Sequence, residues 1–190
     1  MLNIPNGLTV LRLVLGVVFF VLFTREERGY LDAALAVFLL AGITDFLDGY
    51  LARAWHLETD FGRVTDPVVD KILIAGAFIL AIGRDAGVEA WMVVVIVARE
   101  FLIGNVRELL EGRGTPFGSL MAGKGKLVVQ FVAVCAVVLY LGHGRDVVWA
   151  HGATRVCVWL AVAATVLSGL VYLARLPGGT GETPGNRGGL

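Results

Sequence analysis

Residues 31–82 read LDAALAVFLLAGITDFLDGYLARAWHLETDFGRVTDPVVDKILIAGAFILAI, and this stretch decides the fold. Two apolar runs, residues 31–51 and 68–82, enclose a short polar segment. About 20 mainly apolar residues cross the ~30 Å hydrocarbon core of a membrane as a helix, and each run extends toward that length by a turn or more. Strands of a membrane barrel would alternate apolar and polar residues, and these runs do not. The stretch therefore predicts two antiparallel transmembrane helices joined by a polar connection.

Four further apolar runs lie outside this stretch, at residues 8–23, 90–103, 127–141 and 156–173. The 190 residues are 57% hydrophobic and 17% charged, whereas soluble domains are about 25% charged. The mean hydropathy of +0.78 excludes a soluble globular domain, a disordered chain and a secreted disulfide scaffold. The sequence thus predicts an all-α integral membrane protein with six transmembrane helices, built as one domain from residues 1–175.

The distribution of basic residues predicts how the chain is oriented. Six spans place both termini on one side, where the connections and the tail hold eight Lys and Arg residues, against four on the other side. Basic residues are enriched in cytoplasmic loops, so both termini are predicted to be cytoplasmic, in the cell (inner) membrane. The tail, residues 176–190, is rich in Gly and Pro and is predicted to be disordered. With 16 basic and 16 acidic residues, no net charge attracts the chain to nucleic acid.

Four aspartates flank the polar segment at helical spacing. Asp45 and Asp48 are three residues apart near the end of one predicted span, and Asp66 and Asp70 are four apart at the start of the next. Residues at these spacings share a helix face. Since consecutive spans are antiparallel neighbours, we expect the four carboxylates to converge near the cytoplasmic surface.

Four carboxylates in a pocket of low dielectric stay ionised together only if cations offset their charge. Hard oxygen ligands select Mg²⁺, Mn²⁺ or Ca²⁺ and exclude zinc as the preferred ion. Two such ions would suit a displacement at phosphorus. Gly49 allows a flat group to approach the backbone, and Arg53 is suited to a phosphate.

Two other interpretations explain less of the pattern. The acids could cap helix ends and pair with basic neighbours in a structural membrane subunit, which is the ordinary interpretation for one Asp pair but leaves four unexplained. A cation transporter could use them as an ion path. Transporter sites, however, lie near the membrane midplane, and they do not require Gly49, Ala52 and Arg53 at fixed positions.

The acidic stretch fits the pattern D-x2-D-G-x2-A-R-x8-G-x3-D-x3-D at every position. This pattern resembles the signature of the CDP-alcohol phosphatidyltransferases, enzymes that transfer a phosphatidyl group from a CDP-lipid to an alcohol and release CMP. The resemblance implies six transmembrane helices and a homodimer. It implies that two divalent ions, Mg²⁺ or Mn²⁺, are held by Asp45, Asp48, Asp66 and Asp70, with Asp70 also the catalytic base. It further implies that the CDP-lipid is held by Asp48, Gly49, Ala52, Arg53 and Gly62.

The flanking sequences narrow the resemblance to members whose acceptor is sn-glycerol 3-phosphate. They read NIPNGLTVLRLVLG at residues 3–16, AREFLIGNVRELLEGRG at 98–114 and GKGKLVVQ at 123–130. The expected substrates are CDP-diacylglycerol and glycerol 3-phosphate, within membrane lipid, and the expected products are phosphatidylglycerophosphate and CMP. Phosphatidylglycerol, inositol phosphate and serine remain open as alternative acceptors.

Basic residues of the fourth connection are candidates for the acceptor phosphate. They are Arg107, Lys124 and Lys126. For the two lysines, a role in membrane topology or in contacting anionic headgroups explains their positions equally well. Arg99 and Glu100, adjacent and of opposite charge, are interpreted as a structural pair.

Overall fold

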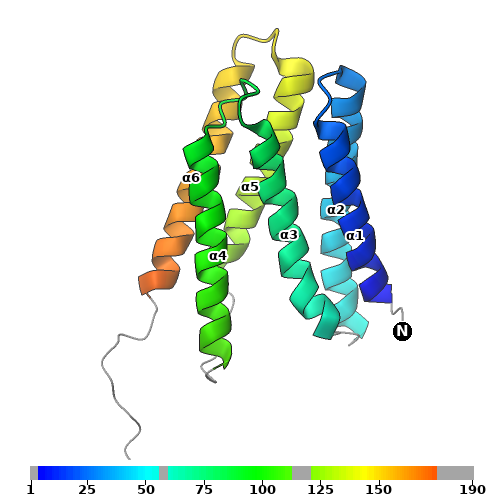
Figure 1. Cartoon of the computed structure of the whole chain (residues 1–190), viewed down its shortest axis with the longest axis vertical. Helices are drawn as coiled ribbons and strands as arrows, with labels where there is room; N and C mark the ends of the chain where they lie inside the picture. The colour runs from blue at the N-terminus through cyan, green and yellow to red at the C-terminus, as the bar shows by residue number, and fades with distance from the viewer. Residues whose placement is uncertain (1–3, 56–59, 113–120, 175–190) are drawn as a thin grey trace, which may run out of the picture.

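The computed structural model describes the backbone of residues 4–55, 60–112 and 121–174, and the side chains of residues 7–45, 68–106 and 125–174. These described residues form six α-helices and one π-helical turn, with no β-strand (Figure 1). The helices are α1 (Ile4–Phe23), α2 (Arg28–Trp55), α3 (Asp60–Ala81), α4 (Ala90–Gly112), α5 (Met121–Leu139) and α6 (Ala150–Ala174), and the π-helical turn η1 is Tyr140–Gly144. The predicted tail, residues 176–190, lies outside the described residues, as does Arg175 at the end of the predicted domain.

Each predicted apolar run corresponds to one helix, but several helices are longer than their runs. α3 begins at Asp60, eight residues before its apolar run, and α4 continues to Gly112, nine residues past its apolar run. The prediction placed the ends where charges begin, whereas a helix can continue through charged residues once it leaves the hydrocarbon. Of the described helical segments, Gly125–Gly144 and Ala150–Ala174 are long and apolar enough to cross a membrane, and Gly7–Phe23 is a shorter apolar helix. The all-helical class is confirmed, and six spans stay a prediction.

Consecutive helices run in opposite directions. One end of the bundle, the lower end in Figure 1, therefore contains the N-terminal ends of α1, α3 and α5 and the C-terminal ends of α2 and α4. We call it the acidic end. α1 packs against both α2 and α3, while α5 packs against α6 and α2, and α4 packs against α6 and α3. The acidic parts of α2 and α3 therefore lie at the same end, beside α1.

An aromatic cluster holds α1, α2 and α5 together. The rings of Phe19 and Phe38 are 5.1 Å apart, and those of Phe38 and Phe131 are 4.6 Å apart and stacked. Phe19 and Phe38 are fully buried. A Cβ atom at Gly42 would lie 2.6 Å from the Phe131 ring, so this position of α2 requires glycine for the helices to approach closely. The same holds for Gly76 of α3 against Phe20.

The outer surface of α1 is apolar as well as its core face. Val10, Val14, Val17 and Val21 are each about half exposed and follow one another at helical spacing. A water-soluble bundle would place polar residues on such a stripe. This surface is what a helix in contact with lipid requires.

At the opposite end of the bundle, Arg84 joins the α3–α4 connection to the α1–α2 connection. Its guanidinium donates to the carbonyls of Phe23 and Arg25, and it lies 4.8 Å from the Phe23 ring centroid. Burial lowers the pKa of Arg84, and the nearby Glu26 opposes that shift. Gly83 and Gly87 have positive φ angles of 77° and 71°, which let the chain turn tightly on either side of Arg84.

Candidate active site

Three helices meet at a buried guanidinium near the acidic end of the bundle. Arg12 of α1 places Nη1 2.8 Å from Oδ1 of Asp45 on α2 and 3.3 Å from Oδ1 of Asp70 on α3. The two carboxylates come from positions 25 residues apart in the chain. We call Arg12, Asp45 and Asp70 the acidic site. The expected convergence of the two helices is thus found for Asp45 and Asp70.

The three side chains of the acidic site differ in exposure. The side chain of Arg12 is 1% exposed, whereas those of Asp45 and Asp70 are 47% and 29% exposed. Arg12 is thus enclosed by the protein, whereas the two carboxylates are partly accessible. The three residues line a pocket whose other walls are Ala41, Gly42, Leu73, Ile74, Leu127 and Phe131.

Sequence reasoning did not assign Arg12 to the site. It is the sole charged residue of α1, and an ionisable residue within an apolar helix usually faces a partner in the bundle. That signal pointed to a functional position, but the sequence did not identify Asp45 and Asp70 as its partners.

The remaining motif residues lie on the two helices that carry the described aspartates. Asp48, Gly49, Ala52 and Arg53 belong to the last turns of α2 and Gly62 and Asp66 to the first turns of α3. Their side chains lie outside the described residues, and so do those of Arg107 on α4 and Lys124 on α5. The roles predicted for these residues stay predictions.

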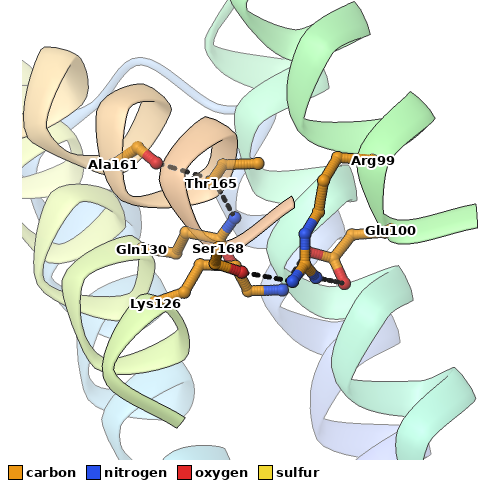
Figure 2. Close-up of polar contacts among 7 residues, drawn as sticks. All are labelled: Arg99, Glu100, Lys126, Gln130, Ala161, Thr165 and Ser168. Carbon is orange, nitrogen blue, oxygen red and sulfur yellow. Dashed lines mark hydrogen bonds and ion pairs between the residues drawn. The ribbon is translucent and has the colours of Figure 1, made fainter. Parts of the chain in front are cut away.

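A second group of charged side chains lies between α4, α5 and α6 (Figure 2). Lys126 of α5 donates to Oε1 of Glu100 on α4, and Arg99 Nη1 lies 3.5 Å from Oε2 of the same carboxylate. Arg99 also donates to the hydroxyl of Ser168 on α6. We call Arg99, Glu100, Lys126 and Ser168 the basic network. The pairing expected for Arg99 and Glu100 is present, and Lys126, a candidate for the acceptor phosphate, is a third member.

The side chains of the basic network are buried or nearly so, whereas the carboxylates of the acidic site are partly exposed. Glu100 and Lys126 are 9% and 4% exposed. One turn away, Gln130 donates to Thr165 Oγ1 at 2.9 Å, and that hydroxyl donates to the Ala161 carbonyl at 2.6 Å. Buried polar groups are costly unless they are paired, and these two hydrogen bonds satisfy the side chains of Gln130 on α5 and Thr165 on α6.

The donor set of the acidic site fits a divalent cation. Within the described side chains, no three acidic, His or Cys residues form a cluster, and two of the four motif aspartates fall within that part of the chain. Those two carboxylates contact one guanidinium and line a pocket. Carboxylate oxygens are the ligands that Mg²⁺ and Mn²⁺ prefer.

Comparison with known proteins shows the family of this chain. The sequence profile of the family CDP-alcohol phosphatidyltransferase matches residues 2–167. A curated relative from Bacillus subtilis is 34% identical over 187 residues, covering 92% of this chain and 95% of that protein. Others from Rickettsia typhi (32% over 172 residues, 90% and 96% coverage) and Escherichia coli K12 (33% over 178 residues, 90% and 93% coverage) carry the same name, CDP-diacylglycerol–glycerol-3-phosphate 3-phosphatidyltransferase. The chain belongs to the CDP-alcohol phosphatidyltransferase family.

Proposed function

We propose that this protein transfers the phosphatidyl group of CDP-diacylglycerol to sn-glycerol 3-phosphate, giving phosphatidylglycerophosphate and CMP. The name shared by relatives that align over nine-tenths of the chain supports both substrates. The observation that carries the proposal is the meeting of Asp45 and Asp70 at one pocket, because both belong to the complete eight-residue motif.

In the proposed reaction, a hydroxyl oxygen of glycerol 3-phosphate forms a bond to the phosphorus that carries diacylglycerol. The bond from that phosphorus to the CMP oxygen breaks, and CMP leaves with the electron pair. Asp70 accepts the proton of the attacking hydroxyl at its carboxylate. General-base catalysis of this kind contributes typically 10²–10⁴-fold in rate.

The four motif aspartates, Asp45, Asp48, Asp66 and Asp70, would hold two ions, Mg²⁺ or Mn²⁺. When bound, such ions supply positive charge that offsets the charge on the attacking and leaving oxygens. The chain's own residues bind and orient the donor: Arg53 at the diphosphate, and Asp48, Gly49, Ala52 and Gly62 around the cytidine and diphosphate, as the family signature implies.

Arg107, Lys124 and Lys126 are the proposed contacts of the acceptor phosphate. Leu127, which follows Lys126, lines the pocket of the acidic site, so the start of α5 borders both regions. Lys126 is paired with Glu100 in the structure, and a phosphate contact would require it to serve both anions.

The proposed setting is the cell (inner) membrane, which the chain crosses six times. Both termini and the active site would face the cytoplasm, and the protein would form a homodimer. The exposed valines of α1 support the membrane setting, and the excess of Lys and Arg in the connections on the side of the termini supports the orientation. Single cysteines introduced at residues 26–29 are expected to react with an impermeant thiol reagent from outside the cell, and those at residues 111–114 only after the membrane is opened. The reverse pattern would contradict this orientation.

The direct experiment is product analysis. Purified protein in detergent would be given CDP-diacylglycerol with Mg²⁺ and, separately, glycerol 3-phosphate, serine, inositol phosphate or phosphatidylglycerol. We expect a lipid product and CMP with glycerol 3-phosphate. Product from another acceptor alone would contradict the acceptor and keep the family chemistry, whereas no CMP with any of them would contradict the transferase.

A further inference from the structure

Arg12 touches both described aspartates of the motif through a single nitrogen. The contacts of 2.8 and 3.3 Å run from Nη1 to one oxygen of Asp45 and one oxygen of Asp70. Charge-assisted contacts of this kind are among the stronger ones in proteins. Through them α1, which carries none of the motif residues, reaches both helices that do.

We infer that Arg12 is a positioning residue that holds the carboxylates of Asp45 and Asp70 in the arrangement in which they receive divalent cations. The inference rests on the proposed function, which assigns cations to these aspartates. Outer partners of metal-binding side chains orient the ligands in just this manner in known metal sites.

The exposure of the three side chains separates positioning from simple competition with a cation. Arg12 is enclosed, whereas the carboxylates are 47% and 29% exposed, so an ion from outside the protein can reach the aspartates without displacing Arg12. Arg12 can therefore keep its contacts while the exposed sides of the carboxylates accept ligands. Without Arg12, the two carboxylates would repel each other and lose the contacts that fix their orientation.

The direction of the effect provides a sharp test. If Arg12 acted only through its charge, removing it would make the pocket more negative and strengthen cation binding. If Arg12 positions the aspartates, its removal weakens binding in spite of the added negative charge. Loss of an outer partner typically lowers metal affinity by about 10–100-fold.

The experiment measures Mn²⁺ binding to the full-length protein in detergent, by the loss of the free-ion electron paramagnetic resonance signal. We expect Arg12→Met to bind Mn²⁺ at least about tenfold more weakly than the wild type. Arg12→Lys keeps the charge but not the reach or planar shape of the guanidinium, and we expect binding at least about threefold weaker. Arg84→Met, a matched control at the opposite end of the bundle, should leave the affinity unchanged.

Unchanged or tighter Mn²⁺ binding by Arg12→Met would overturn the inference. Thermal midpoints in EDTA would show whether each variant is folded, and if Arg12→Met is not, Arg12→Lys decides: wild-type affinity there would mean that charge alone matters. A wild-type protein that binds no Mn²⁺ would overturn both this inference and the metal-dependent part of the proposed function. The measurement does not involve turnover, so a different acceptor would leave it valid.

Discussion

The acidic site and the basic network use the same chemical groups in opposite proportions. In the acidic site one buried cation, Arg12, serves two partly open carboxylates. In the basic network one buried carboxylate, Glu100, serves two cations, Arg99 and Lys126. Counted over these named groups alone, acids outnumber bases in the acidic site, and bases outnumber acids in the basic network.

The difference indicates how the charges of each region are compensated. Charges inside a low-dielectric protein need partners of opposite sign. In the basic network Arg99 also donates to the hydroxyl of Ser168, so its charged groups contact one another and this hydroxyl between three helices. The acidic site remains open on its carboxylate side, so its charge can be offset from outside the protein by cations. Openness, more than charge alone, separates the proposed reaction centre from the internal network.

Removal of divalent cations should give the largest contrast between the two regions. We expect excess EDTA to abolish phosphatidyl transfer and added Mg²⁺ or Mn²⁺ to restore it, because the proposed reaction places divalent cations on the carboxylates of the acidic site. CMP release is the measurement. Full activity in excess EDTA would contradict the two-ion proposal.

Asp70→Asn should have the next largest effect. The amide keeps the size of the side chain but cannot accept a proton, so turnover should fall by about 10²–10⁴-fold. Asp32→Asn is the matched control, since Asp32 contacts His143 at 2.7 Å at the far end of the bundle and is half exposed. Near wild-type turnover of Asp70→Asn would assign Asp70 a structural role.

Lys126→Ala tests whether the basic network also contacts the acceptor. Charge-assisted hydrogen bonds contribute about 1.5–3 kcal/mol each. We expect the KM for glycerol 3-phosphate to rise at least about tenfold, with a much smaller change for CDP-diacylglycerol.

Because Lys126→Ala also leaves Glu100 without its lysine, the double variant Glu100→Gln/Lys126→Met is needed beside it. This variant removes both charges and keeps the side-chain sizes. A raised KM in both variants would support a phosphate contact. A raised KM in the single variant alone would mean that Lys126 serves only as the partner of Glu100.

The smallest effect is expected for an ion pair that belongs to neither region. Arg28 and Asp146 lie 3.1 Å apart, with side chains 68% and 81% exposed. Exposed pairs contribute about 0–1 kcal/mol. Asp146→Asn should shift the thermal midpoint by less than about 4 °C and leave turnover unchanged. A larger loss would mean that the α5–α6 connection is more important to the fold than its exposure indicates.

The sequence predicted the helical class and the meeting of Asp45 with Asp70, because both follow from local periodicity and antiparallel connection. The apolar run of α3 begins eight residues after the helix itself, since apolar runs report contact with hydrocarbon and helices continue beyond it. The sequence did not identify the partners of Arg12, or the contact of Lys126 with Glu100, which lies 26 residues away. Both depend on which helices become neighbours, and hydropathy carries little information about that choice.

The size of residue 42 affects the position of Asp45 in the acidic site. A single added methyl group there would overlap the Phe131 ring, with the new carbon 2.6 Å from it. Asp45 follows less than one turn later on the same helix, which behaves as a stiff rod over so short a length. Enlarging residue 42 would force the Phe131 ring or α2 to shift, and a shift of α2 would carry the Asp45 carboxylate with it. The chain thus sets the location of an acid through the volume of an uncharged neighbour, and steric substitutions in this seam act on the acidic site without touching its charges.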